Sequence, residues 1–377
     1  MKISVARDVF TEAVSWVART IPTRPAVPVL AGLKMVATDD GNVALGSRDS
    51  DITSHADIEA EVAEAGEVLV NGRLLADICK SLPNLPIKLR LEGSRLEIEC
   101  GSAMFTLKTM VMADYQELPE LTDVVGTVNG ADWQEAVSQA TIAASSDDTL
   151  PMLVSVCLEI EGDRITLLAT DRYRLAAREV SWTPRQPDIS MRILARATRL
   201  ADVAKSLGTS GPIEITMNPE GPGGLIGMSA GSRRNTIQLI DGDYPQVRSL
   251  FPAEINGYAT IDRAALLDAI KRSRLVVEKN SAVRLSFAEG EVVLEAGHGD
   301  NAQASEVLEA ELNGEDIKMA FNPAFLQEGL MAMTGDSVRL AFTHPGKPAV
   351  MTSVNKDGEV DDDFRLLLMP IRTFGNA

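Results

Sequence analysis

Apolar residues recur at helical spacing in segments that resemble one another along the chain. Residues 75–82 and 200–207 read LADICKSL and LADVAKSL, so six of eight positions are identical at a separation of 125 residues. Residues 326–333 form a weaker third copy. A second trio combines a short strand, a polar helix-start residue and an amphipathic helix, at residues 5–14, 128–137 and 261–270. The pattern predicts three repeats of about 125 residues, each with two helices.

Between these helices, apolar residues alternate with polar ones, which is typical of antiparallel strands with one buried face. Turn-forming residues interrupt the alternation at 39–42, 92–94, 161–163, 221–224, 289–290 and 345–347. We therefore predict an α+β fold of three repeated domains, with boundaries at 1–124, 125–252 and 253–377. Repeats of this size usually build an extended or closed surface, so we favour that role over repetition for stability alone.

Composition and charge narrow the class of protein. The 377 residues are 45 % apolar and 4 % aromatic, and the formal charge is −18, which argues against holding nucleic acid by bulk electrostatics. Cys79, Cys100 and Cys157 form no C-x-x-C pair, so we expect buried free thiols and a reducing, cytoplasmic location. The N-terminus lacks an apolar signal core, and no uncharged apolar stretch is long enough to span a membrane.

The sequence contains no recognisable catalytic constellation. It has neither a G-x-x-x-x-G-K-[ST] phosphate loop nor a G-x-S-x-G nucleophile elbow. His55, His298 and His344 are far apart in the sequence, and we interpret them as surface or turn residues. Asp361-Asp362-Asp363 is expected to be a solvated acidic turn rather than a magnesium site. We predict a protein that is not an enzyme and has no metal or cofactor; an enzyme acting on DNA is the disfavoured alternative.

Basic residues recur on the repeated helices of this acidic chain. If equivalent helices face one way, their Arg and Lys side chains line one surface and the acidic excess lies opposite. Ordinary solvated helix faces are the simpler reading, and only the repetition favours a basic surface. The residues are Arg7, Arg19, Arg73, Lys80, Arg196, Arg199, Lys205, Arg263, Lys271 and Arg272, with Arg24 in a nearby loop.

The whole chain resembles the bacterial DNA polymerase III β subunit, the β sliding clamp family. The resemblance rests on the three-fold repeat and on residues 24–25, 28–30, 170–175, 241–245, 321–322 and 368–372. It implies a ring-shaped homodimer whose helices line a central hole around double-stranded DNA, with antiparallel sheets outside. Arg24 and Arg73 match DNA-contacting positions of the family, whereas Arg196 and Arg199 are assigned to DNA by charge and repeat alone.

The resemblance also implies one peptide-binding pocket per protomer. The replicative polymerase, the ATP-dependent clamp loader and repair and translesion polymerases would compete for it through short motifs with Gln and Leu or Phe, and peptide antibiotics would bind there too. Three positions match the family dimer interface: Phe105, Leu107 and Leu275. The positions that match the pocket are Leu153, Thr170, Arg172, Arg174, Leu175, Pro245, Arg248, Leu250, Asn322, Phe325, Val350, Met369, Pro370, Ile371 and Arg372.

Two departures from the family pattern concern this pocket. Arg172-Tyr173 stands where the family commonly has Gly-His, and residues 373–377 extend beyond the usual end. Both changes favour, as an alternative, a specialised clamp paralogue with an altered pocket, for example an inhibitor-resistant one. A structural repeat scaffold that does not bind DNA is the other alternative.

Overall fold

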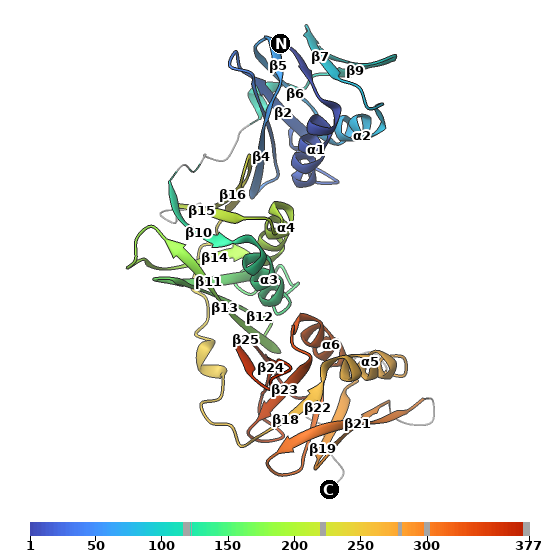
Figure 1. The fold of residues 1–377 in the computed structure, drawn as a ribbon, viewed down its shortest axis with the longest axis vertical. Coiled ribbons are helices and arrows are strands. Elements are labelled where there is room, and N and C mark those ends of the chain that lie inside the picture. Colours follow the sequence, from blue (N-terminus) through green and yellow to red (C-terminus); the bar gives the residue numbers. More distant parts are fainter. Residues whose placement is uncertain (116–120, 122, 219–223, 278–280, 298–301, 372–377) are drawn as a thin grey trace. The chain divides into compact units, whose positions relative to one another are not determined.

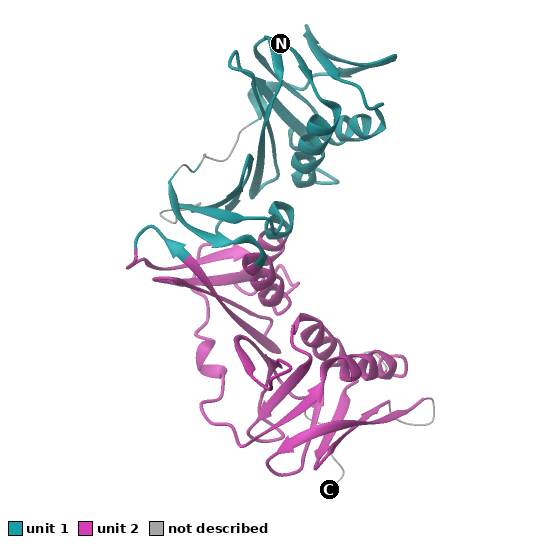
Figure 2. Ribbon diagram, viewed as in Figure 1, with its two compact units in different colours: residues 1–131, 183–186, 202–239 teal, residues 132–182, 187–201, 240–377 magenta. Residues whose placement is uncertain are grey.

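The computed structural model describes residues 1–371 except 116–120, 122, 219–223, 278–280 and 298–301. The chain forms two compact units (Figure 2). Unit 1 comprises Met1–Ala131, Thr183–Gln186 and Asp202–Leu239, and unit 2 comprises Asp132–Trp182, Pro187–Ala201 and Ile240–Ala377. Each unit is built on antiparallel sheets, as the alternating sequence pattern predicts.

Unit 1 contains two antiparallel sheets (Figure 1). The first has the order β5-β1-β7-β8-β9, with bounds Glu61–Glu64, Lys2–Val5, Ile87–Glu92, Arg95–Cys100 and Ala103–Lys108. The second has the order β6-β2-β3-β4-β17-β16-β15-β10, with bounds Gly66–Asn71, Gly32–Ala37, Asn42–Arg48, Ile52–Glu59, Arg233–Gln238, Leu225–Ala230, Pro212–Asn218 and Val124–Asn129. Because β17 pairs with β4, this sheet joins the first repeat to part of the second.

Two helices, α1 (Arg7–Val17) and α2 (Gly72–Ser81), pack against each other in unit 1. Their apolar faces are buried, and Phe10, Val14 and Leu75 are completely inaccessible to solvent. Burying such a face supplies most of the stability of a short helix. Three 3₁₀ turns complete the unit, at Ala18–Thr20, Pro28–Ala31 and Met112–Asp114.

Unit 2 has one long run of antiparallel strands and the helix pair α5 (Arg263–Ser273) and α6 (Pro323–Ala332) (Figure 1). A 3₁₀ turn spans Arg248–Leu250, and α3 (Gly130–Thr141) and α4 (Ala197–Leu207) have residues in both units. The strands follow the order β14-β11-β12-β13-β25-β24-β23-β18-β21-β20-β19-β22, with bounds Ser190–Arg196, Ser155–Glu161, Arg164–Thr170, Arg174–Pro184, Val360–Leu368, Ala349–Val354, Ser337–Phe342, Gly257–Asp262, Ala304–Asn313, Glu291–Ala296, Val283–Ala288 and Ile317–Phe321.

Short polar side chains at strand ends begin the helices. Asn71 accepts a hydrogen bond from the Leu74 N–H at the start of α2, and Asp262 does the same for Ala265 in α5. Asn322 caps α6 in the equivalent place. Such caps satisfy N–H groups that have no partner inside the helix, and replacing one usually costs about 1 kcal/mol.

Most sequence predictions of elements are confirmed. The six helices are present, and hairpins turn near residues 39–42, 92–94, 161–163, 289–290 and 345–347; the predicted turn at 221–224 lies largely outside the described residues. The prediction of an acidic turn at residues 361–363 is wrong, because these residues lie within β25. Their backbone extends because β25 continues the pairing with β24 as far as Val360.

The three cysteines are free and buried, as expected. Burial raises the pKa values of Cys79 and Cys157 to about 12, so both thiols stay protonated at neutral pH. His344 lies exposed in the turn after β23, whereas His55 is half-buried on β4 and is neither a turn nor a fully exposed residue; His298 lies outside the described residues. None of the described helices is long and apolar enough to cross a membrane.

The two compact units do not coincide with the three predicted domains, whose boundaries stay a prediction. The reason lies in strand pairing: β17 of the second repeat pairs with β4 of the first, and β13 of the second repeat pairs with β25 of the third. Each half of the second repeat therefore shares a sheet with a neighbouring repeat.

Candidate peptide-binding site and basic surface

The turn between β12 and β13 is held by two side chains. Thr170 Oγ1 accepts a hydrogen bond from the Arg172 N–H (3.1 Å) and donates one to the Arg174 carbonyl (2.6 Å). Asp171 Oδ1 accepts hydrogen bonds from the N–H groups of Tyr173 and Arg174, both at 3.0 Å. Side-chain bonds of this kind stabilise tight turns. The turn is therefore a rigid element that presents the side chains of Arg172 and Tyr173 to solvent.

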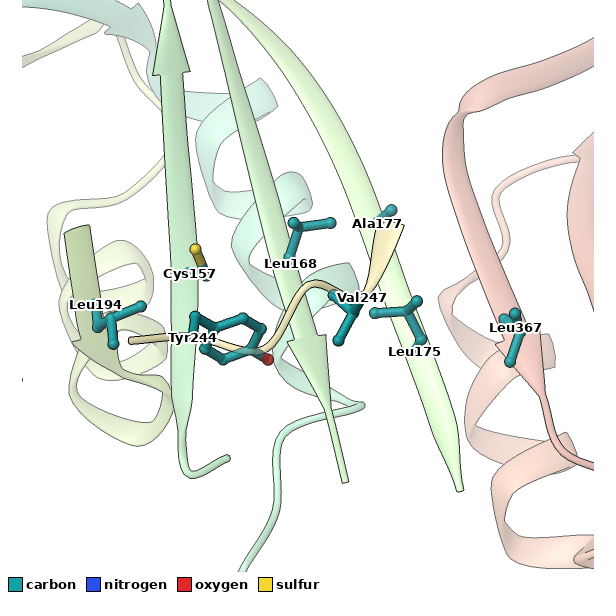
Figure 3. Close-up of a cluster of buried hydrophobic side chains, with 8 residues drawn as sticks. All are labelled: Cys157, Leu168, Leu175, Ala177, Leu194, Tyr244, Val247 and Leu367. Atoms are coloured by element: carbon teal, nitrogen blue, oxygen red, sulfur yellow. The ribbon is translucent and has the colours of Figure 1, made fainter. Parts of the chain in front are cut away.

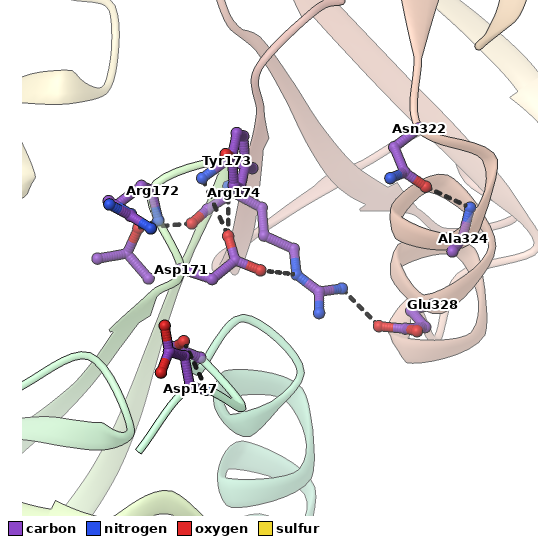
Figure 4. A network of polar contacts seen from close by, with 10 residues as sticks. Asp147, Asp171, Arg172, Tyr173, Arg174, Asn322, Ala324 and Glu328 are labelled. Atoms are coloured by element: carbon purple, nitrogen blue, oxygen red, sulfur yellow. Dashed lines mark hydrogen bonds and ion pairs between the residues drawn. The ribbon is translucent and has the colours of Figure 1, made fainter. Parts of the chain in front are cut away.

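Arg172 adopts a left-handed backbone conformation. Its φ is 78°, and among the described residues it is the one non-glycine residue with positive φ. Its exposed side chain lies near Asp147 (Figure 4). The Thr149 hydroxyl and N–H, and then the Arg172 charge, hold the pKa of Asp147 below its usual value. A glycine at this position, as in the family pattern, would avoid the backbone strain.

Arg174 joins the turn to helix α6 (Figure 4). Its side chain is 8 % exposed; Nε donates to Asp171 Oδ2 (2.9 Å) and Nη1 to Glu328 Oε2 (2.5 Å). The guanidinium also stacks on the Phe325 ring, 4.3 Å from its centroid. Gly329 lets α6 approach β25 closely, since a Cβ there would lie 2.6 Å from Leu366 Cδ2.

The C-terminal tail lies against the β12–β13 turn and against β22. The Met369 N–H donates to the Tyr173 carbonyl (2.9 Å), and the Ile371 N–H donates to the Ala320 carbonyl (2.7 Å). Tyr173 stacks on Phe325 with ring centroids 6.4 Å apart. The structure thus brings Thr170, Arg174, Phe325 and the tail together, and their role in a peptide pocket stays a prediction. Arg372 lies outside the described residues.

A buried apolar cluster forms the floor beside this turn (Figure 3). Leu175 is 1 % exposed and lies opposite Leu367, which in turn lies opposite Val350 on β24. Tyr244 and Val247, from the segment after β17, pack into the same cluster. Pro245 and Leu250 on that segment are exposed, as are Met369 and Ile371 on the tail; Leu153, Asn322 and Pro370 are half-buried. Among the apolar residues predicted for the pocket, Leu175 and Val350 are buried and belong to what we call the floor. Four are exposed and form what we call the apolar rim: Pro245, Leu250, Met369 and Ile371.

Arg248 is held by a carboxylate beneath it. Glu159 on β11, 8 % exposed, accepts a hydrogen bond from Arg248 Nε (2.6 Å) and a second one from Arg192. A nearly buried carboxylate needs such partners, because an unpaired charge there would be costly. Glu159 therefore fixes the position of Arg248.

Two arginines of unit 1 are expected at DNA by family position, Arg24 and Arg73. They lie near each other, because Arg73 contacts Thr23, the residue before Arg24. Arg73 on α2 is exposed and donates from Nη2 and Nε to the Ile21 carbonyl (2.6 and 3.2 Å), and from Nη2 to Thr23 Oγ1 (3.3 Å). It thereby ties the helix to the loop that carries the exposed Arg24. The guanidinium of Arg73 orients this loop in addition to contributing charge.

Arg196 and Arg199 lie at the end of β14 and in the first turn of α4, and both are half-buried. Arg196 Nη1 lies 2.7 Å from Asp148 Oδ1. This ion pair offsets part of the positive charge that the sequence assigned to DNA binding.

The residues expected at the dimer interface differ in exposure. On β9, Phe105 is 37 % exposed but Leu107 is only 4 % exposed and belongs to the core of unit 1. Leu275, which follows α5 in unit 2, is 86 % exposed. β9 is the last strand of its sheet and pairs with β8 alone among the described strands. Such an edge is available to another chain.

The sequence analysis did not predict three carboxylates that hold arginines or turns at this site. Asp171 lies within residues 170–175, and an aspartate two and three residues before the N–H groups that it accepts from is a local sign of a turn. Glu159 and Glu328 reach their arginines across 89 and 154 residues of chain, and nothing local in the sequence marks them. Within the described ranges, no group of three His, Cys, Asp or Glu side chains is arranged to hold a metal ion.

Comparison with known proteins follows the order of the repeats. Three family models match: the N-terminal domain of the DNA polymerase III beta subunit over residues 1–119, its central domain over 127–246 and its C-terminal domain over 248–372. The chain is 46 % identical to the beta sliding clamp of Streptomyces coelicolor over 377 residues, covering all of both chains. It is 49 % identical to the beta sliding clamp of Micrococcus luteus over 306 residues, covering 81 % of this chain and 98 % of that one.

A solved structure has the same fold. The sliding clamp of Pseudomonas aeruginosa bound to griselimycin superposes with a TM-score of 0.91 at 23 % identity. The match covers 99 % of this chain and all of that one.

Proposed function

Because this chain belongs to the DNA polymerase III β subunit family, we propose that it is a DNA polymerase processivity factor, a sliding clamp around double-stranded DNA. The observation that supports this proposal most strongly is that the models of the N-terminal, central and C-terminal domains of this subunit match the chain in order between residues 1 and 372. In this proposal each protomer has clamp domains at 1–124, 125–252 and 253–377. Two protomers close a ring with helices around the hole and sheets outside.

The charge distribution supports topological binding of DNA. A net charge of −18 repels nucleic acid from most of the surface, whereas Arg24 and Arg73 offer phosphates a local positive site. Arg196 is a weaker candidate because Asp148 already pairs with it, and Arg199 is a weaker candidate because it is half-buried. Few phosphate contacts permit sliding, since a ring is retained by its closure and not by affinity.

The turn, the tail and helix α6 support a peptide-binding role in unit 2. An exposed apolar rim over a buried floor, with Arg174 and Asn322 alongside, suits an extended peptide with a few apolar anchors. In this role the replicative polymerase, the clamp loader and repair and translesion polymerases bind through short motifs. A Pseudomonas clamp binds griselimycin, and we propose that peptide antibiotics of that kind bind this chain too.

The remaining parts of the proposal follow from the same role. The chain acts as a tether and not as a catalyst, needs no metal or cofactor, and works in the cytoplasm where the replication machinery is. The homodimer uses Phe105 on the open edge of β9 together with Leu275 of the partner's third repeat, and Leu107 supports this edge from the core of unit 1. Such a head-to-tail contact closes into a ring when the rotation returns on itself.

Retention on circular DNA tests the clamp. Loaded clamp is expected to stay on closed circular DNA through gel filtration and to leave after one double-strand cut, because only ring closure holds it. The combined change Arg24→Glu and Arg73→Glu should reduce loading while sedimentation still gives a dimer. Retention that survives linearisation would contradict the ring.

Two truncations test the pocket. Removing residues 369–377 deletes both N–H donors of the tail and its apolar rim, so a fluorescent clamp-binding peptide should lose at least about 30-fold in affinity. Removing residues 373–377 alone is the matched control and should leave the affinity within about twofold. A dimer that lacks 369–377 but binds the peptide as tightly as the full chain would disprove the pocket.

A specialised paralogue stays the second candidate because of one observation. Arg172 holds a left-handed conformation beside the pocket, where the family pattern has glycine. Its bulk and charge would alter which peptides or inhibitors bind, without changing the clamp role.

A further inference from the structure

A basic groove of about 610 Å³ lies on the sheet of the third repeat, next to the tail. Its lining includes Arg284 and Ser286 from β19, Lys318 from β22, and His344 and Lys347 from the turn between β23 and β24. One carboxylate, that of Glu295, lines it too. Neither the polymerase tether nor the DNA hole of the proposed function uses these residues.

The strand register places these side chains on one face of the sheet. Ser286 lies opposite Lys318, and Arg284 lies opposite both Ala320 and Glu295. The alternate residues of β19, namely Val283, Leu285 and Phe287, are buried in the core. Because side chains alternate across a strand, Arg284 and Ser286 point away from the core and into the groove.

The groove has an excess of positive charge on an acidic protein. Arg284 Nε lies 4.0 Å from Glu295 Oε2, and this one carboxylate offsets only one of the three Arg and Lys charges that line the groove. Lys318 and Lys347 are exposed, and no ion pair is found for either within the part of the chain that the structure describes. On a chain of net charge −18, such a cluster of cations concentrates attraction for an anion.

The groove is continuous with the tail. Ile371 lines it, and the Ile371 N–H donates to the carbonyl of Ala320 on β22, the strand that carries Lys318. Met369, two residues earlier, touches Tyr173 at the candidate peptide site. A polypeptide that crosses the tail therefore passes directly from the apolar rim to the cations.

We propose that this groove binds an acidic stretch of the partner polypeptide, adjoining the motif that occupies the pocket. The inference rests on the proposed function of the pocket. Charge complementarity and continuity with the tail favour an acidic chain. Duplex DNA fits less well, because the groove faces away from the core that α5 and α6 cover, and those helices are the elements proposed to face DNA.

Four labelled peptides test the proposal by fluorescence anisotropy on the intact protein. They are a core clamp-binding motif alone, the same motif with four Asp or Glu residues before it, with four after it, and with four neutral residues. One of the two acidic extensions is expected to raise affinity about fivefold, the effect of two or three exposed ion pairs. The gain should vanish at about 0.5 M salt, because screening is then nearly complete.

Matched charge reversals locate the effect. Lys347→Glu and Lys356→Glu make the same change in the turns at the two ends of β24. The first, and more strongly the pair Lys318→Glu with Lys347→Glu, should abolish the gain from the acidic extension while core-motif affinity stays within about twofold. Lys356→Glu should change neither value.

The outcomes separate the two claims. A core motif that does not bind would overturn the proposed pocket. A core motif that binds equally well with acidic and neutral extensions would overturn the groove. Binding of a short linear duplex that is lost in the Lys318→Glu and Lys347→Glu variant would also overturn it, because the groove would then be a DNA site.

Discussion

Arg172 bears a conformational cost that its neighbours impose on a single residue. Thr170 accepts a hydrogen bond from the N–H of Arg172, and Asp171 accepts hydrogen bonds from the next two N–H groups, so the turn holds the φ of Arg172 at 78° through bonds that do not involve its side chain. For an L-residue with a Cβ, this left-handed region costs about 1–2 kcal/mol. The exposed guanidinium gains little from nearby Asp147 to offset that cost.

Arg172→Gly should therefore raise the free energy of unfolding by about 0.5–1 kcal/mol, the relieved strain less the extra entropy of glycine in the unfolded chain. Urea unfolding followed by circular dichroism measures the change. Arg164→Gly, on β12 and without positive φ, is the control and should lower stability. A lower stability for Arg172→Gly would mean that the side chain contributes more than the turn costs.

Sequence comparison with the family pattern found the unusual residue but not its conformation. Arginine has no preference for positive φ, so its identity gave no sign of the left-handed turn. The roles of Glu159, which is nearly buried, and of Glu328, which is exposed, were missed for a related reason. Their roles depend on arginines far along the chain, and only the folded sheet brings them together.

At the scale of elements, Arg174 connects the β12–β13 turn to helix α6. Its guanidinium is nearly buried between Asp171, Glu328 and the Phe325 ring, and Asp171 is itself only 13 % exposed. Arg174→Ala should lower the free energy of unfolding by about 2–4 kcal/mol, because Asp171 would keep a poorly solvated charge without its partner.

Glu328→Gln is the matched comparison. Glu328 is 49 % exposed, so its ion pair is screened by solvent and its loss should cost less than about 1 kcal/mol. Denaturant unfolding of both variants gives the two values. Equal losses would show that the pair with Glu328, and not the burial of Asp171, stabilises the junction.

Elements with local signals were predictable from the sequence. Gly41, Gly93 and Gly290 lie in hairpin turns at positive φ, and Asn71 and Asn322 cap helices where polar residues follow strands. The prediction of a turn at residues 361–363 was wrong, because a run of acidic residues taken alone is typical of a solvated turn. Pairing of β25 with β24 overrides that preference, as tertiary context often does for strands.

At the scale of the whole molecule, Leu275 is the most exposed large apolar side chain among the described residues, at 86 %. If it closes the proposed ring, Leu275→Asp places an unpaired charge in the interface and should weaken the dimer at least about tenfold. Sedimentation velocity over a concentration series measures this. Met331→Asp is the control. Met331 is 62 % exposed near the end of α6, where Arg263 at the start of α5 donates hydrogen bonds to the carbonyls of Leu330 and Gly335.

A dimer that is weakened equally by both changes would argue against a specific contact at Leu275. A dimer unaffected by Leu275→Asp would remove this residue from the interface and leave the open edge of β9 as its remaining support.

The pairing of β25 with β13 also has a mechanical consequence. Five consecutive residue pairs, from Arg174–Leu368 to Arg178–Phe364, join the third repeat to the second, and the tail is the direct continuation of β25. In the proposed function, a moving enzyme that is tethered to the tail would pull on this ladder along the strand, so its hydrogen bonds would be loaded together in shear rather than opened one by one. The strand β25 thus both leads into the tail and joins the second repeat to the third. A steady pull on the tail loads this pairing in the direction in which it resists best.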